Sequence, residues 1–127
     1  MQLVYDRECP VCAAYCHSLK AALPGLRLVS AREDTPILRE ITRRGLDIDE
    51  GMVLEAEGEI FYGAEALQAL AARATGGARS RVNRWLFGSL RRSRILYPAL
   101  RSARNGLLKI LRRTRINNLG RPGNERF

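Results

Sequence analysis

The chain has 127 residues, of which 46% are hydrophobic, and carries a formal net charge of +9. This length suits a single domain with its own core, and no run approaches the ~20 consecutive apolar residues that a transmembrane helix needs. The first residues, Met1 to Asp6, reach an acidic side chain at once, so we expect no signal peptide, no membrane span and a cytoplasmic protein.

The first 45 residues alternate between strand and helix patterns. Leu3 to Tyr5 is a short β-favouring run, and residues 10–23 repeat apolar side chains at helical spacing before Pro24-Gly25. Residues 26–32 alternate again, and Thr35-Pro36 opens a helix over 37–44. The order is therefore βαβα, which places the first two strands parallel.

The next segment adds a hairpin and a helix. Residues 52–56 and 59–62 flank Glu57-Gly58, which is typical of a hairpin turn, and the Ala- and Leu-rich residues 64–74 predict a third helix. The predicted fold is α/β, with a thioredoxin-like mixed sheet in the order βαβα-ββα. We expect this domain to span residues 1–77.

Residues 78–127 have a different character and are interpreted as a basic helical extension packed on the same domain. Residues 73–127 hold 15 Lys/Arg and one acid, whereas residues 1–72 hold 7 Lys/Arg and 12 Asp/Glu. Helices are predicted over 80–90 and 93–115, with Pro98 in the first turns of the second or kinking it. At 100° per residue the second helix has an apolar stripe opposite a cationic face; the stripe contains Leu96, Leu100, Ala103, Leu107, Ile110 and Leu111.

The extension has more than one expected role. The apolar stripe can pack on the domain, or residues 79–115 can bind an anionic membrane surface or an acidic protein. Nucleic acid is not an expected partner, because the few aromatic residues form no evident stacking platform. A non-catalytic interaction module that uses these helices is therefore an alternative function.

Two cysteines, Cys9 and Cys12, follow the first predicted strand. If the helix begins at Pro10, Cys9 is its N-cap, and its sulfur accepts backbone hydrogen bonds at the positive end of the helix dipole. Both effects lower the thiol pKa. We predict that Cys9 attacks a disulfide substrate and that the less exposed Cys12 resolves the mixed disulfide. This chemistry needs no cofactor, and its electrons come from a thiol donor.

Asp6 and Cys16, which lie near the two cysteines in sequence, each have two possible roles. Asp6 can act as an acid/base for Cys12 or accept hydrogen bonds from loop N–H groups. Cys16 is expected as a small core residue, with a regulatory or second resolving thiol as the alternative, and His17 on the solvated helix face. A metal site of Cys9, Cys12, Cys16 and His17 is a rival by count, but the helix turns His17 away from Cys16 and there is no second C-x-x-C.

The stretch "YDRECPVC" resembles the D-x-x-C-P-x-C signature of the DCC family of thiol-disulfide oxidoreductases, in the thioredoxin-like superfamily, with Asp6, Cys9 and Cys12 at the matching positions. The segments "DEGMVL", "FYGAEAL" and "YPALRSARN" also resemble the family layout. The resemblance implies a thioredoxin-like fold and thiol-disulfide exchange. Arg7 stands where the family commonly has glycine, and no proline precedes Met52, so the cis-proline platform of thioredoxins is not expected.

Overall fold

The computed structural model describes residues 1–74, 81, 84–85, 89–123 and 125–126. Most of the predicted helix over 80–90 lies outside these residues. In chain order, the elements are β1 (Gln2–Tyr5), α1 (Pro10–Ala22), β2 (Arg27–Ser30), α2 (Pro36–Arg43), β3 (Val53–Ala56), β4 (Glu59–Tyr62), α3 (Ala64–Arg73) and α5 (Leu90–Ile110). The predicted thioredoxin-like α/β arrangement, with a C-terminal helix, is confirmed.

The four strands of the described chain form one mixed sheet in the order β2-β1-β3-β4. β1 pairs in parallel with β2 and antiparallel with β3, and β3 and β4 form a hairpin. Glu57 and Gly58 have φ angles of 55° and 80°, the left-handed conformation that a two-residue hairpin turn requires. Both the parallel pair and the hairpin agree with the prediction from sequence.

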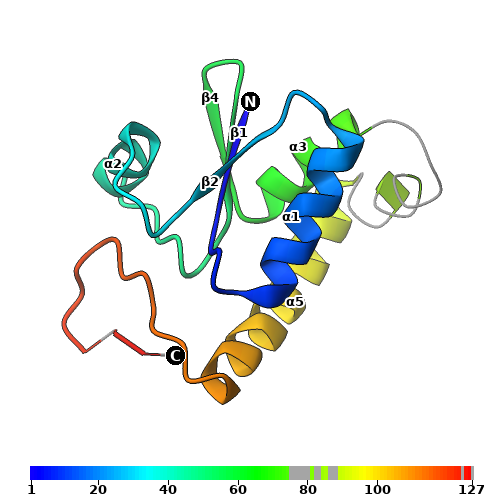
Figure 1. Ribbon diagram of the computed structural model, residues 1–127. Coiled ribbons are helices and arrows are strands. Elements are labelled where there is room, and N and C mark those ends of the chain that lie inside the picture. Colours follow the sequence, from blue (N-terminus) through cyan, green and yellow to red (C-terminus); the bar gives the residue numbers. More distant parts are fainter. Residues whose placement is uncertain (75–80, 82–83, 86–88, 124, 127) are drawn as a thin grey trace.

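Helices cover both faces of this sheet (Figure 1). Successive side chains of a strand point to opposite faces. Leu3 and Leu54 therefore join the cluster that contains residues of α1 and α3, whereas Val4 and Val53 pack with Ile41 of α2 on the other face. The carboxyl end of β1 leads directly into the loop that carries the cysteines.

α5 packs on α3, where Leu96 and Tyr97 contact Leu67 and Ala71. The helix keeps Pro98 in its interior. It ends at Ile110, five residues before the predicted end, because the chain turns at Arg112, whose φ is 53°. No helix among the described residues has the length and apolar character needed to cross a membrane.

The buried side of α5 differs from the predicted apolar stripe. Ser93 and Leu108 are fully buried, whereas Leu100 and Ile110, both in the stripe, are 49% and 80% exposed. Apolar periodicity shows which residues share a face, but the rotation of the helix is set by its contacts. Here Tyr97 packs on α3 and accepts a hydrogen bond from the Met52 N–H, just before β3. Part of the stripe is left facing solvent and a cavity.

The segment after α5 is irregular, and it is fixed to the domain by a buried carboxylate. Asp49 is fully buried and accepts hydrogen bonds from the backbone N–H groups of Ile116 (3.0 Å) and Asn117 (2.7 Å). The Asn118 side chain donates to the Leu46 carbonyl and accepts from the Ile48 N–H. The C-terminal segment therefore lies against the loop that precedes β3.

Candidate active site

Cys9 is the N-cap of α1, as the sequence predicts. Its backbone is extended (φ −85°, ψ 109°), Pro10 occupies the first helical position, and the Cys12 N–H donates to the Cys9 sulfur over 3.2 Å. Proline suits this place because its missing N–H would have no partner within the helix. The strand-loop-helix order thus brings a thiol to the positive end of a helix.

The two cysteines of the motif have opposite electrostatics. The hydrogen bond from the Cys12 side chain, supported by the Cys12 N–H and the positive charge of Arg104, lowers the pKa of Cys9 to about 6, against the opposing effects of burial and Asp6. The same hydrogen bond to Cys9, together with burial, raises the pKa of Cys12. The pair therefore consists of one acidic thiol and one that holds its proton.

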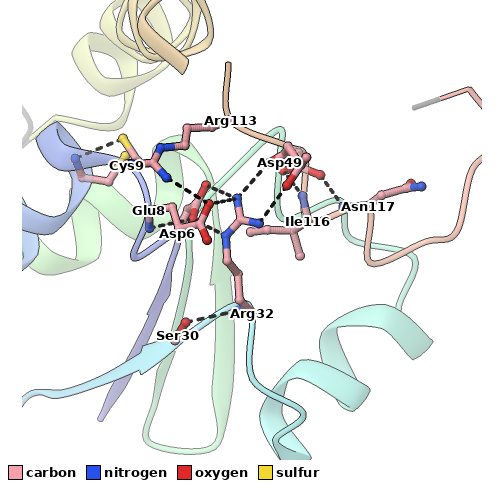
Figure 2. Close-up of polar contacts among 11 residues, drawn as sticks. Asp6, Glu8, Cys9, Ser30, Arg32, Asp49, Arg113, Ile116 and Asn117 are labelled. Carbon is pink, nitrogen blue, oxygen red and sulfur yellow. Dashed lines mark hydrogen bonds and ion pairs between the residues drawn. The ribbon is translucent and has the colours of Figure 1, made fainter. Parts of the chain in front are cut away.

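The exposure of the two thiols differs from the expected order. Cys9 is fully buried, whereas Cys12 is half-buried. Sequence reasoning expected Cys12 to be the less exposed, because it lies one turn further into the helix. Arg113, in the segment after α5, forms a long ion pair of 4.0 Å with Glu8, the residue before Cys9 (Figure 2).

Asp6 is buried and held by a two-point ion pair. Arg32 donates to both carboxylate oxygens, over 2.9 and 3.2 Å, and the Glu8 N–H donates to Oδ1 over 3.0 Å (Figure 2). Bidentate pairs of this kind fix the orientation of a carboxylate. The expected contact with a loop N–H is therefore present, and the acid/base role of Asp6 stays a prediction.

Arg32 and Arg104 are site residues that sequence reasoning missed. Arg32 follows β2, and the parallel pairing of β1 and β2 is the signal that its side chain could meet Asp6 at the same sheet edge. Arg104 lies about 80° around α5 from Leu96, at the border of the apolar stripe. Its Nη1 donates to the Asp49 carbonyl over 2.7 Å.

A cavity of about 390 Å³ lies beside the dithiol. Its walls include Val11, Cys12 and Tyr15 of α1 and Leu100, Ala103 and Leu107 of α5. Asp6, Arg101 and Arg104 also line it, whereas most of the remaining wall is apolar. The part of the α5 stripe that does not pack on the domain therefore faces the accessible thiol.

Cys16 and His17 do not join the dithiol. Cys16 is fully buried in the core cluster, and burial raises its pKa to about 12. His17 is exposed on α1, as expected. In the part of the chain that the structure describes, no three His, Cys, Asp or Glu side chains are grouped to hold a metal ion.

The backbone before β3 is bonded within the domain. The Met52 N–H donates to the Tyr97 hydroxyl over 3.0 Å, and the Met52 carbonyl accepts from the Gly63 N–H over 2.9 Å. No peptide bond of the described residues is cis. Gly51 precedes Met52, and the ring of Tyr62 lies so close that a side chain has no room at this position.

Comparison with known proteins agrees with this geometry. The family model described as DCC1-like thiol-disulfide oxidoreductase matches residues 3–110, which include Asp6, both cysteines of the motif and all of α5. Neither the curated proteins nor the solved structures gave a match. The match covers most of the chain and places the motif after β1 inside the family model, so the chain belongs to the DCC1-like thiol-disulfide oxidoreductase family.

Proposed function

We propose that this protein is a thiol-disulfide oxidoreductase in which Cys9 attacks and Cys12 resolves. The observation that carries the proposal is the position of Cys9 at the N-cap of α1, where the Cys12 N–H donates to its sulfur over 3.2 Å. The hydrogen bond from the Cys12 side chain, together with this position, lowers the pKa of Cys9 to about 6. At neutral pH most of Cys9 is then thiolate, the form that attacks disulfides. Cys12 keeps its proton until the second step.

The exchange has two steps and balances without a cofactor. The Cys9 thiolate attacks one sulfur of a substrate disulfide, the substrate S–S bond breaks, and the first half leaves as a thiolate that takes up a proton. Cys12 then loses its proton and attacks the Cys9 sulfur, which releases the second half. The two cysteines are oxidised to one disulfide, the substrate is reduced to two thiols, and an external thiol donor restores the dithiol.

Asp6 is proposed as the supporting acid/base group. Its carboxylate lines the same cavity as Cys12, and Arg32 fixes its orientation. A proton acceptor on this wall is suited to the resolving step, because Cys12 must be deprotonated before it attacks.

Access to Cys9 requires a local shift of the chain. Cys9 is fully buried, so a substrate sulfur reaches it only after the loop that carries it moves. The Glu8–Arg113 ion pair that joins this loop to the segment after α5 is long, and its side chains are 43% and 48% exposed. Such solvent-exposed pairs resist opening only weakly.

A redox titration tests the proposal. Wild type and the variants Cys9→Ser and Cys12→Ser are equilibrated in glutathione buffers, and free thiols are alkylated and counted by mass. We expect a reversible two-electron transition in the wild type alone, with a midpoint in the range of about −120 to −270 mV spanned by known dithiol oxidoreductases. Absence of this transition, or thiols that resist alkylation until a chelator is added, would overturn it.

A second candidate function is docking to an anionic membrane surface. Ile95, Ile110 and Leu111 of the C-terminal region are 68%, 80% and 43% exposed, and exposed basic residues such as Arg94 and Lys109 lie on the same helix. An apolar face beside cationic side chains is what interfacial binding needs.

Vesicle flotation of the full chain tests this docking. We expect the protein to float with vesicles that contain phosphatidylglycerol but not with neutral phosphatidylcholine vesicles, and Ile110→Asp to weaken the flotation. A protein that stays in solution with both kinds of vesicle excludes the membrane role.

A further inference from the structure

We propose that the substrate is a small anionic disulfide with an apolar arm, and that the cavity beside Cys12 binds this arm. The inference rests on the thiol-disulfide activity proposed above and names the substrate class of the same site.

The size and lining of the cavity fit a small molecule. Its volume of about 390 Å³ falls within the range of roughly 300–1,000 Å³ that is usual for small-molecule sites. Leu100 lines the cavity and is 49% exposed, so the other side chains of the domain leave about half of its surface uncovered. An alkyl arm placed there removes apolar surface from water.

The charge of the cavity favours an acid at the end of that arm. Arg101 and Arg104 both line it, and the positive charge of Arg104 lowers the pKa of Cys9. Among the described residues of the lining, Asp6 is the one acid, and its carboxylate is already bound by Arg32. Arg101 forms an ion pair with Glu50, which lies outside the lining and also pairs with Arg115. A carboxylate is therefore better matched to this site than a neutral group.

The backbone near the site argues against an extended protein substrate. Polypeptides are commonly held by hydrogen bonds to a free main-chain N–H and C=O. At Met52, which also lines the cavity, the N–H is bonded to Tyr97 and the carbonyl to the Gly63 N–H. Recognition here is left to side chains, which suits an apolar arm.

The arm also has a defined place in the exchange. After the first thiolate leaves, the second half of the substrate is attached to Cys9 through a mixed disulfide. Cys12 lies in the cavity wall, so an arm held in the cavity lies beside the thiol that releases it.

The test uses the full-length reduced protein and four disulfides. 6,6′-Dithiodihexanoic acid has the proposed long anionic arm, 3,3′-dithiodipropionic acid is its short analogue, bis(6-hydroxyhexyl) disulfide is its neutral analogue, and insulin is a protein disulfide. Each rate constant is divided by that of dithiothreitol with the same disulfide, which removes intrinsic reactivity. We expect the long acid to react at least about tenfold faster than the short acid, because its three additional methylenes are buried, and faster than both other substrates.

Variants locate the effect. Ala103→Phe fills the cavity and should lower the ratio of long-acid to short-acid rates to near one, whereas Ser102→Phe, an exposed residue of α5 outside the lining, should leave this ratio unchanged. Arg101→Gln should lower the preference for the long acid over the neutral analogue while the chain-length preference remains. A merely structural role of Arg101 would not change that selectivity.

The outcomes separate the two proposals. If the protein reduces several disulfides in a reaction that needs Cys9, but the normalised rates are equal or insulin is fastest, the substrate class is wrong and the oxidoreductase activity stands. If no disulfide is reduced in a reaction that needs Cys9, both proposals fall. An Ala103→Phe variant that keeps the full long-acid preference would also overturn the assignment of the cavity.

Discussion

The acidity of Cys9 depends first on a single neighbouring side chain. Because the Cys12 hydrogen bond is the largest cause of the lowered pKa, Cys12→Ala should raise the pKa of Cys9 more than Cys12→Ser, which keeps a hydroxyl donor. In the wild type, the thiolate should form as the pH rises through about 6, so that disulfide attack is slow below this pH and reaches a plateau above it. The ultraviolet absorbance of the thiolate measures each titration.

Cys9→Ser provides the control for this titration and should remove the acidic transition. Equal Cys9 pKa values in the alanine and serine variants would contradict the role assigned to the Cys12 side chain. The Cys12 N–H donor is a backbone group and is retained in both variants, so the comparison isolates the side-chain hydrogen bond.

The Asp6–Arg32 pair should contribute to stability through its burial. The Asp6 side chain is 3% exposed and that of Arg32 is 22% exposed. Removing one partner leaves the other charge poorly solvated, so Asp6→Asn should lower the free energy of unfolding by about 2 kcal/mol, below the value for a completely buried pair. Urea unfolding of the reduced protein measures the loss.

The double variant Asp6→Asn, Arg32→Met is the matched test of that pair. Its free energy of unfolding should fall by less than the sum of the losses in the two single variants, because neither member of the pair is then left as a charge without its partner. Strictly additive losses would show that the two side chains stabilise the fold independently.

Local chemistry explains which site residues could be predicted. Cys9 and Cys12 are fixed by the strand, the proline at the first helical position and the helix N-terminus, all within a few residues of one another. Arg32 and Arg104 reach the same site from β2 and α5, 26 and 98 positions beyond Asp6 in sequence. Their approach depends on tertiary packing, which no short motif encodes.

At the scale of elements, the hydrophobic pattern predicted where strands and helices occur better than it predicted which side of α5 packs on the domain. Successive side chains of β1 and β3 are buried on opposite faces of the sheet. Their alternating hydrophobic pattern and the turn residues that bound them were therefore sufficient to predict them as strands. α5 has more apolar residues than its contact with α3 covers. Its rotation, and the cavity that results, follow from the fit of Tyr97 against neighbouring elements.

The join between β3 and its preceding loop requires glycine. A Cβ atom at Gly51 would lie 2.7 Å from the Tyr62 ring, and that ring is held by a 2.8 Å hydrogen bond from its hydroxyl to the Asp47 carbonyl. Gly51→Ala should therefore lower the free energy of unfolding by about 1–3 kcal/mol, as overpacking commonly does. Thermal unfolding measures this change.

Gly25 offers the matched glycine control. A Cβ at this position meets no atom within 4 Å, so Gly25→Ala should leave stability unchanged or slightly increase it by restricting the unfolded chain. A melting temperature for Gly51→Ala equal to that of Gly25→Ala would show that Tyr62 moves aside freely.

At the scale of the whole molecule, Asp49 connects the loop before β3 to the C-terminal segment. Its carboxylate accepts two backbone N–H groups, and hydrogen bonds to charged groups stabilise by about 1.5–3 kcal/mol each. Asp49→Ala should lower the free energy of unfolding by about 3 kcal/mol. It should also speed hydrogen exchange at the Ile116 and Asn117 amides.

Asp34→Ala is the control for this prediction, because Asp34 is exposed and pairs with Arg39 at the surface. It should leave both the unfolding midpoint and the exchange at residues 116 and 117 unchanged. Slow exchange at these amides in Asp49→Ala would mean that other contacts are sufficient to hold the segment.

The position of these donors has a consequence for synthesis on the ribosome. The Ile116 and Asn117 N–H groups that satisfy Asp49 lie 67 and 68 positions after it in the chain. The ribosome therefore makes all four strands of the sheet and the loop that carries Asp49 before it makes the segment that carries these donors. During that interval the Asp49 carboxylate lacks its two N–H partners, so the loop before β3 reaches its final stability only after the C-terminal segment has emerged.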